Sequence, residues 1–305
     1  MIKRATFTDK RLPYLLVLPQ IAITLVFFFW PAGQALFQAF LVEDAFGLST
    51  KFTWEAVDNA GRSLGAFWNF ERVLSDPHYL SSVSVTFVFT AAACILSLSA
   101  ALFLAVMADR IIRGATTYKT FLIWPYAVAP AVAGVLWGFM FNPTIGVVTY
   151  LLGAVGYTWN YVIDGDEALA LIVLATAWKN VSYNFIFFLA GLQAIPRSLI
   201  EASAIDGAGP GKRFWTVIFP LLSPTMFFLL VLNIVHVFFD TFGIVDATTQ
   251  GGPGQDTFIL VYKVFRDSVR GQDLGSSAVQ SVVLMSLVIA LTVVQFRYIE
   301  RKVHY

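Results

Sequence analysis

Charged residues are scarce in this chain of 305 residues. Asp, Glu, Lys and Arg together form 13% of it, whereas an average soluble protein contains about 25%. Cysteine is nearly absent: Cys94 stands alone, which excludes a disulfide within the chain and a site built from several thiolates. His78, His236 and His304, the three histidines, are far apart, so the sequence offers no cluster of catalytic or metal-ligating side chains. With 58% apolar residues, the composition is that of a membrane protein.

Six long windows without charge predict the architecture. Apart from Lys179, no Asp, Glu, Lys or Arg interrupts them, and each exceeds the roughly 20 residues that a helix needs to cross a bilayer. We therefore expect an all-α, polytopic membrane protein in which residues 1–305 form one domain. The expected spans lie near residues 12–41, 79–108, 118–142, 168–194, 216–242 and 274–297.

The third window, residues 120–163, is long enough for two spans, but the basic residues favour one. Lys and Arg accumulate in cytoplasmic loops. Six spans with both termini in the cytoplasm place 13 of these residues inside and six outside, whereas a seventh span gives ten against nine. Within the single span, Pro125 and Pro130 should bend the helix, and Asn142-Pro143 should end it. The sequence therefore predicts six transmembrane helices and a cytoplasmic N- and C-terminus.

The polar stretch "EASAIDGAGPGKRFWTVIFP", residues 201–220, lies in an expected cytoplasmic loop. At first sight its glycines suggest a phosphate-binding loop, which needs Gly, four residues and then Gly-Lys-Ser/Thr. Counting from Gly211-Lys212, the first glycine position holds Asp206 and the hydroxyl position holds Arg213. The motif fails at both places, so we expect no nucleotide site in this chain.

The same stretch specifies a shaped element instead. Ser198 and Glu201 have the Ser-x-x-Glu spacing of a capping box, which predicts a helix that begins there and runs to about Asp206. A turn rich in glycine and proline then stops it, and a second helical piece should begin near Lys212 and meet Pro220. A plain turn needs only a few residues. The stretch therefore indicates a docking element for a cytoplasmic partner.

These residues resemble the EAA loop of bacterial ABC-importer permeases. The family pattern is Glu-Ala-Ala, three residues, Gly, nine residues and Ile-x-Leu-Pro. The wider sequence, from "LPYLLVLPQ" through "WPYAVAPAVAGVLWGFMFNP" and "TTQGGP" to the C-terminus, is similar to the carbohydrate-type, maltose-like branch of that family. The matching loop positions are Glu201-Ala202-Ser203, Gly207, Val217, Phe219 and Pro220.

The resemblance implies an ABC type I importer permease in the bacterial cytoplasmic (inner) membrane. A second permease subunit would complete a heterodimer, two ATPase subunits would hold ATP and magnesium, and a periplasmic solute-binding protein would deliver the substrate. This chain would then be no enzyme, would bind no cofactor, and would contact the lipid bilayer and no nucleic acid. Residues 195–220 become the cytoplasmic coupling loop, with Glu201, Ala202, Ser203, Asp206, Gly207 and Pro220 as the ATPase-coupling residues.

Two interpretations of Glu201 stay open at this point. Its carboxylate can pair with an arginine of the ATPase, or it can do no more than complete the capping box. The residues favour neither.

Lys179 is the one unambiguous charge within an expected span; the others lie at span ends. It lies 12 residues from Glu167 and 18 from Arg197, about 18 Å and 27 Å along a helix and so near mid-membrane. A charge there costs at least about 2.5 kcal/mol on insertion scales, so it should face a partner or a wet cavity. We favour a place on the path of an anionic substrate over a structural pair with Asp240 or with the partner subunit. His236 is interpreted as a packed side chain without an acidic partner one turn away.

Helical spacing and the resemblance together predict a substrate path. Ile234 and Phe238 are apolar and should wall the path rather than bind substrate. The cation suits a phosphate ester, and the resemblance implies sn-glycerol-3-phosphate or glycerophosphodiesters; a neutral sugar or oligosaccharide is the alternative. The predicted path residues are Tyr126, Lys179, Asn180, Tyr183, Ile234, Phe238 and Thr241.

Two other classes of membrane protein fit the sequence less well. Proton-driven secondary transporters usually carry several intramembrane carboxylates, whereas only Asp240 comes near a span here. A membrane enzyme such as a lipid transferase would need clustered His, Asp or Glu at a membrane face. An ATP-driven importer permease is therefore the preferred interpretation.

Overall fold

The computed structural model describes residues 12–43, 50–58, 61–109 and 115–299. Helices make up most of this part of the chain, which confirms the all-α class apart from one two-stranded sheet. Contacts divide the chain into two compact units, and α15 contributes to both. The first comprises Met1–Ser75 and Arg266–Val283, and the second comprises Asp76–Phe265 and Leu284–Tyr305.

Helices suited to crossing a membrane match the expected spans in position. Among the described residues, 4 single helices are long and apolar enough, and the number rises to 6 if each of two sharply bent helix pairs counts as one span. The count of six spans therefore stays a prediction. The four single helices are Tyr14–Gln38, Pro77–Asp109, Gly165–Ala194 and Leu274–Arg297.

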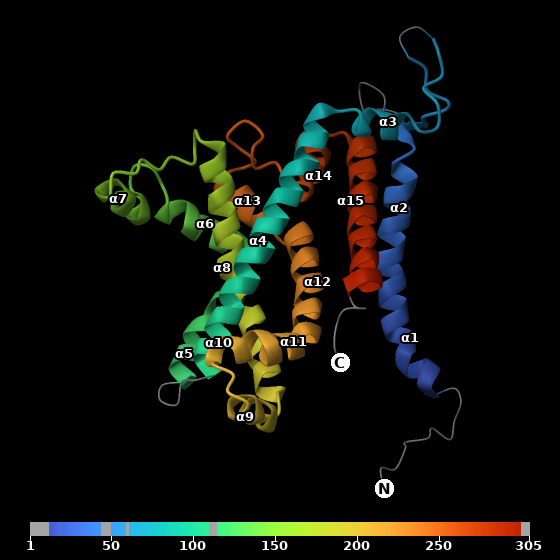
Figure 1. Ribbon diagram of the computed structural model, residues 1–305. Coiled ribbons are helices and arrows are strands. Elements are labelled where there is room, and N and C mark those ends of the chain that lie inside the picture. The colour runs from blue at the N-terminus through green and yellow to red at the C-terminus, as the bar shows by residue number, and fades with distance from the viewer. Residues whose placement is uncertain (1–11, 44–49, 59–60, 110–114, 300–305) are drawn as a thin grey trace. The chain divides into compact units, whose positions relative to one another are not determined.

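The first unit contains a long apolar helix, a two-stranded sheet and a short helix (Figure 1). Strands β1 and β2 pair antiparallel, with Leu41 opposite Phe52, a hairpin that the sequence did not predict. Its elements are α1 (Leu12–Thr24), a π-helical segment (Leu25–Phe29), α2 (Trp30–Gln38), β1 (Leu41–Glu43), β2 (Thr50–Phe52), α3 (Trp68–Leu74), a second π-helical segment (Arg266–Arg270) and the start of α15 (Leu274–Val294).

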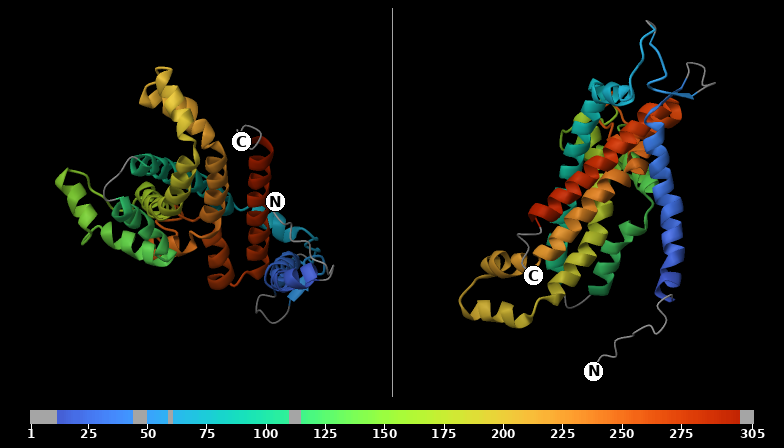
Figure 2. Two further views of the ribbon diagram at one scale, coloured as in Figure 1. Left: turned by 90° about the horizontal axis from the view of Figure 1, so that it is seen from below. Right: turned by 90° about the vertical axis from the view of Figure 1, so that its right-hand side faces the viewer.

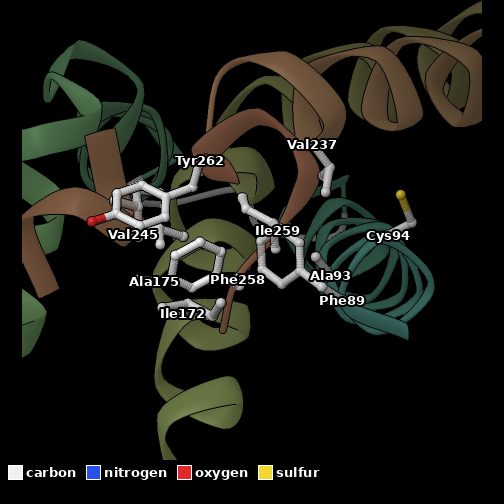
Figure 3. Close-up of a cluster of buried hydrophobic side chains, with 11 residues drawn as sticks. Phe89, Ala93, Cys94, Ile172, Ala175, Val237, Val245, Phe258, Ile259 and Tyr262 are labelled. Carbon is white, nitrogen blue, oxygen red and sulfur yellow. The ribbon is translucent and has the colours of Figure 1, made fainter. Parts of the chain in front are cut away.

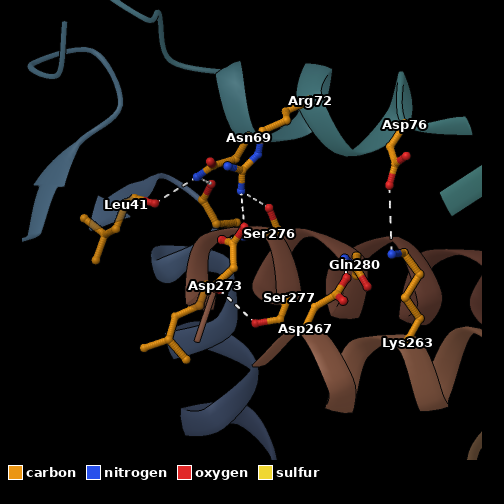
Figure 4. Close-up of polar contacts among 12 residues, drawn as sticks. Leu41, Asn69, Arg72, Asp76, Lys263, Asp267, Asp273, Ser276, Ser277 and Gln280 are labelled. Atoms are coloured by element: carbon orange, nitrogen blue, oxygen red, sulfur yellow. Dashed lines mark hydrogen bonds and ion pairs between the residues drawn. The ribbon is translucent and has the colours of Figure 1, made fainter. Parts of the chain in front are cut away.

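Polar side chains hold α3 against the start of α15 and the chain after α2 (Figure 4). The amide of Asn69 donates to the carbonyl oxygens of Ala39 and Leu41 at 2.9 and 2.8 Å. Arg72 donates to the carboxylate of Asp273 and to the hydroxyl of Ser276. These bonds satisfy backbone carbonyls that would otherwise be left without partners.

The second unit contains the helices that matter for function. Figure 1 labels most of them. Its elements are α4 (Pro77–Asp109), α5 (Ala115–Ile123), a 3₁₀ turn (Trp124–Ala127), α6 (Pro130–Met140), α7 (Val147–Ala154), α8 (Gly165–Ala194), α9 (Arg197–Ile205), α10 (Pro210–Arg213), a π-helical segment (Phe214–Ile218), α11 (Phe219–Leu221), α12 (Ser223–Phe239), α13 (Phe242–Thr248), α14 (Leu260–Phe265), the end of α15 and a π-helical segment (Gln295–Ile299).

The long helices α4 and α8 form the centre of the second unit. Each begins at an aspartate: Asp76 accepts from the backbone N–H of His78 at 2.9 Å, and Asp164 accepts from those of Asp166 and Glu167 at 3.0 and 3.1 Å. Such bonds satisfy the free N–H groups at a helix start. Beside this start, a hydrogen bond to Glu167 raises the pKa of the Tyr157 phenol.

Two apolar clusters fill the second unit. One gathers side chains from α4, α8, α12, α13 and residues 258–262, including Phe89, Ile172 and Tyr262 (Figure 3). The other packs Ala101, Ala105 and Ala108 of α4 against α8. These small residues recur at helical spacing, so they let the two backbones approach closely, as is common between membrane helices.

The predicted third span is bent at its prolines, and the bend is sharp enough to divide it into two helical arms. The helical arms Thr117–Ala127 and Pro130–Met140 meet at 104°, with Val128 and Ala129 extended between them. A residue before proline avoids the helical region, and proline itself donates no hydrogen bond. The helix ends at Met140, just before Asn142-Pro143 as predicted. Neither arm alone reaches across a bilayer, since each is only about 17 Å long.

The predicted fifth span, near residues 216–242, also differs from the structure. A bend of 66° separates Pro210–Leu221 from Ser223–Phe239, so the straight helix starts at Ser223. Pro224 stands in the first turn of α12 and cannot donate to the carbonyl of Pro220. The helical piece before the bend begins at Pro210 and not near Lys212, because proline suits the first position of a helix.

Candidate transport pathway and coupling loop

A polar cavity of about 390 Å³ opens in the second unit, between the bend of the third predicted span and helices α8, α12 and α13. This volume falls within the range of ligand pockets, about 300–1,000 Å³. Most of its polar groups come from α8 and from the end of α12. The lining comprises Tyr126, Ala127, Val128, Ala129, Pro130, Thr176, Lys179, Asn180, Tyr183, His236, Asp240, Thr241 and Ile244.

One face of α8 supplies the floor of the cavity. Thr176, Asn180 and Tyr183 are at most 8% exposed, and they follow one another at the spacing of one helical turn together with Lys179. The hydroxyls of Thr176 and Tyr183 have no hydrogen-bond partner in the described part of the chain. Buried hydroxyls normally have one. Both oxygen atoms are buried as well as unpaired in this conformation.

Lys179 points toward aromatic rings and not toward an acid. Its Nζ lies 5.9 Å from the centroid of the Tyr126 ring, a distance at which a cation is attracted to the ring face. The rings continue as a chain, with centroids 6.4 Å apart for Tyr126 and Tyr183 and 5.3 Å apart for Tyr183 and His236. Among the described residues no carboxylate oxygen lies within 4.0 Å of Nζ, so the structural ion pair with Asp240 is not formed here.

His236 and Asp240 correct the sequence interpretation. His236 has an acidic residue one turn away after all: its Nε2 lies 3.9 Å from a carboxylate oxygen of Asp240. Both side chains line the cavity, where they are 38% and 67% exposed. The signal was present in the sequence, because residues four apart on a helix are neighbours. From the sequence, Asp240 was weighed only as a carboxylate near a span and as a structural partner for Lys179, and it was not paired with His236.

Five of the seven predicted path residues line the cavity, and two do not. Ile234 packs against the apolar cluster around Phe89. Phe238 is 1% exposed, with its ring 6.0 Å from that of Phe87. The two face away from the cavity because α12 is rotated so that His236 and Asp240 point into it. Their expected role as walls of the path is therefore not seen in this conformation.

Irregular backbone forms the opposite wall. Residues 127–130 line the cavity where the chain passes from the 3₁₀ turn into α6. Backbone outside helices is tolerated at membrane depth where it borders a water-filled cavity, and broken helices commonly surround the substrate sites of transporters. The two prolines predicted to bend this span are the sequence signal that could have located the cavity.

A buried amide pair lies beside the cavity. Asn184 of α8 and Asn233 of α12 exchange two hydrogen bonds, at 3.1 and 2.7 Å. The hydroxyl of Ser97, on α4, donates to the same Asn233 oxygen at 3.2 Å. All three residues are fully buried. Three helices of the second unit are thus joined by polar contacts that lie one residue from Tyr183.

The helix expected to dock on a partner is present as α9, but its start differs. The helix begins at Arg197 after Pro196, and no side chain caps it. Ser198 thus stands inside the first turn, so the predicted capping box is wrong. Pro196 is extended and fixes the start one residue earlier. Within the described residues Glu201 makes no hydrogen bond or ion pair, so the capping interpretation of this residue is excluded.

The end of α9 is shaped by its backbone. Gly207 has φ +80°, the left-handed conformation that glycine adopts readily. The N–H of Gly207 donates to the carbonyl of Ala204 at 3.1 Å, and that of Ala208 donates to the carbonyl of Ser203 at 3.0 Å. These two bonds form a Schellman motif, a common way to end a helix. The predicted stop in the glycine turn is confirmed.

The coupling loop projects from the second unit, with α9 at its tip (Figure 2). Glu201, Ala202 and Asp206 are exposed, and the side chain of Ile205 is 86% exposed. Ser203 turns inward and donates to the carbonyl of Ile200. Pro220 lies apart from these residues, in α11. At the base, Ile200 and Ile218 pack against the apolar cluster around Leu192 and Leu222, so the loop is tied to the helices on both sides.

Comparison with known proteins defines the class first. The family model for the "Binding-protein-dependent transport system inner membrane component" matches residues 159–305, the part that contains α8 to α15. The fold matches a chain in the crystal structure of a bacterial ABC transporter involved in the import of the acidic polysaccharide alginate. That match has a TM-score of 0.78, 18% identity and coverage of 95% of each chain. The architecture is thus that of an ABC type I importer permease.

Relatives with a much higher sequence identity define the family to which the chain belongs. The chain is 57% identical over 304 residues, covering 100% of both, to the sn-glycerol-3-phosphate transport system permease protein UgpA of Brucella suis biovar 1 (strain 1330). It is 56% identical over 304 residues to the protein of the same name from Rhizobium meliloti (strain 1021). The chain therefore belongs to the family of inner-membrane permease components of binding-protein-dependent ABC importers.

Proposed function

We propose that this permease moves sn-glycerol-3-phosphate, or a closely related phosphate ester, into the cytoplasm. The observation that carries the proposal is Lys179, a cation within a long apolar helix that faces a polar cavity and forms no ion pair within 4.0 Å in the described residues. Such a charge is costly in a membrane and usually marks a substrate route. The names of the 57% and 56% identical relatives point to the same substrate.

The cavity offers different groups to the two ends of such a substrate. Lys179 can donate hydrogen bonds to phosphate oxygens. Bonds of this kind to an ionised acceptor are about twice as strong as neutral ones. Asp240 and His236, nearer the exposed side, can accept from or donate to the hydroxyls of the glycerol part. A neutral sugar would meet Lys179 without a charge to balance it.

Transport would be driven from the cytoplasmic side. In this proposal the chain has six spans and both termini in the cytoplasm. It pairs with a second permease, and residues 195–220 dock on one of two ATPase subunits that hold ATP and magnesium. Two observations favour a coupling loop that transmits closure of the ATPase to α8 and α12. The side chains of α9 are exposed, and Ile200 and Ile218 pack at the base of the loop. A periplasmic binding protein would deliver substrate at the opposite side.

Substitution of Lys179 tests the substrate assignment. The assembled importer, in proteoliposomes with its binding protein, should lose at least about tenfold of its glycerol-3-phosphate uptake in Lys179→Ala, since a hydrogen bond to a charged group contributes about 1.5–3 kcal/mol. Lys179→Arg should retain more. Lys51→Ala, an exposed lysine in β2, should leave uptake unchanged.

Uptake and ATPase rate, measured on the same preparations, distinguish a phosphate-ester importer from a neutral-sugar importer. Normal phosphate-ester uptake by Lys179→Ala, with assembly and ATPase rate intact, would exclude the anion site. If that variant instead transports a neutral sugar as well as the unaltered chain does, the sugar importer becomes the better assignment.

A further inference from the structure

A second cavity of the second unit, of about 690 Å³, is apolar where the first is polar. Its walls come from α4 and from the segment that carries α10 and the π-helical residues 214–218, with Met226 of α12 between them. Ile95, Leu102 and Phe103 line one side, and Phe214 and Trp215 line the other. Ser99 supplies the one hydroxyl of this lining, and no charged side chain belongs to it. We call this cavity the apolar groove.

The apolar groove opens to the side of α4 that does not pack on α8. Ala101, Ala105 and Ala108 face the interior, whereas Ile95, Phe103 and Trp215 are 68%, 64% and 64% exposed. Because α4 is long and apolar enough to cross a membrane, a groove on this side of it is suited to contact with acyl chains.

Two basic residues adjoin one end of the apolar groove in sequence. Pro210 and Gly211 line it, and Lys212 and Arg213 follow directly on α10. Neither cation forms an ion pair or a side-chain hydrogen bond within the described residues. Trp215, two residues further, is the residue type that accumulates at the boundary between hydrocarbon and head groups. Basic residues thus follow directly on the part of the lining that Pro210 and Gly211 supply.

The geometry points to a binding site for an anionic phospholipid of the cytoplasmic leaflet. An acyl chain would fill the space between α4 and the aromatic residues, and the phosphate of the head group would lie at Lys212 and Arg213. Basic residues beside membrane helices on the cytoplasmic side bind such head groups. A helix of a partner protein would explain the apolar walls but would leave the two cations without a role. The charge pattern therefore selects the lipid.

The position of the site gives it a possible effect on transport. Helix α10 connects α9, the tip of the coupling loop, to α11 and α12. A lipid held between α10 and α4 would restrain the base of the lever on its membrane side. This consequence rests on the proposed coupling role of the loop, but binding itself does not, so the two can fail separately.

Quenching of Trp215 by brominated lipids tests the site. The assembled importer is placed in nanodiscs of phosphatidylcholine with rising fractions of brominated phosphatidylglycerol, or of brominated phosphatidylcholine for comparison. The chain has eight tryptophans, so the Trp215 signal is the difference between the unaltered importer and Trp215→Phe. We expect half-quenching at a phosphatidylglycerol fraction about fivefold lower than for phosphatidylcholine, the preference that one cation near the membrane surface provides.

Charge-neutral variants establish where the preference arises. Lys212→Gln/Arg213→Gln should make the two lipids equally effective, whereas Arg197→Gln, a basic residue of α9 outside the groove, should keep the preference. Ser99→Phe should fill the groove and reduce quenching by both lipids, and gel filtration of each purified importer shows that it is assembled.

Three results would overturn the site. They are equal quenching by the two lipids in the unaltered importer, a preference that survives in the double variant, and no quenching of Trp215 by either lipid. The last would mean that a protein surface covers the groove.

Discussion

The coupling loop and the polar cavity are built by opposite means. The loop is shaped by hydrogen bonds between residues close in sequence, such as Ala208 to Ser203, and its side chains face outward. The cavity collects residues as distant as Tyr126 and Thr241, and most of its α8 side chains are buried. A locally shaped element keeps its form when it meets a partner. A cavity assembled over long distances changes whenever its helices move, which is what alternating access requires.

This difference separates the expected effects of substitution. Changes in the loop should affect the use of ATP for transport and leave substrate binding intact. Changes in the cavity should do the reverse. The predictions below start with the loop and end with the residues that join the two regions.

Charge reversal at Glu201 should have the largest effect. With the capping box excluded, the exposed carboxylate is left for a partner, and loss of one member of a buried interfacial ion pair costs about 2–5 kcal/mol. Glu201→Arg should reduce uptake roughly tenfold or more, while the chain still inserts and assembles. Uptake in proteoliposomes and copurification of the ATPase measure the two effects.

Asp206→Arg provides the matched control for Glu201→Arg. Asp206 is a neighbouring exposed acid, at the end of α9 instead of on its middle turn, and its reversal should cost less. Normal uptake by Glu201→Arg would contradict an essential charge at this position.

The sequence predicted the loop better than the cavity, for physical reasons. A glycine turn after a short helix is a local signal, and the stop at Gly207 was confirmed. The capping box failed because a serine three residues before a glutamate is compatible with two helix starts, and Pro196 selected the earlier one. Local patterns thus identify an element more reliably than they fix its first residue.

The cavity was predicted only in part because membrane helices are apolar all round. Such a helix carries no stripe that shows which face is buried. On α8, the polar residues Lys179, Asn180 and Tyr183 themselves marked the face. On α12, the rotation that buries Phe238 and exposes His236 follows from contacts with α4 and α8, which the sequence does not contain.

Gly207→Ala tests the local backbone shape of the loop and should have a smaller effect than the charge reversal at Glu201. Nothing lies within 4 Å of the place of an added Cβ, so the cost is that of the left-handed backbone alone, about 1–2 kcal/mol. We expect a several-fold fall in uptake, with unchanged affinity for the binding protein. Uptake at saturating binding protein measures it.

The neighbouring Gly209 offers a control with the same change of side chain. It also has open space around an added Cβ, but its φ is −66°, which alanine adopts freely. Gly209→Ala should retain nearly full uptake. Equal losses in the two variants would show that the backbone shape of the turn does not matter.

Substitutions in the amide pair that joins α8 to α12 should have the smallest effect on the stability of the permease. They are also the most informative, because they test a link between two helices. Asn184→Leu and Asn233→Leu each leave one buried amide without its partner, whereas the double variant removes both polar groups at similar volume. Interhelical hydrogen bonds in membranes contribute about 0.6 kcal/mol on average and up to about 1.7. A double-mutant cycle on unfolding of the permease in detergent mixtures should therefore give a coupling energy in that range.

If the losses of stability in the two single variants simply add in the double variant, the pair is not an energetic link. If coupling is found and the single variants lower uptake without changing ATPase assembly, the pair transmits loop movement to the cavity, because it joins the two helices that lead from one to the other.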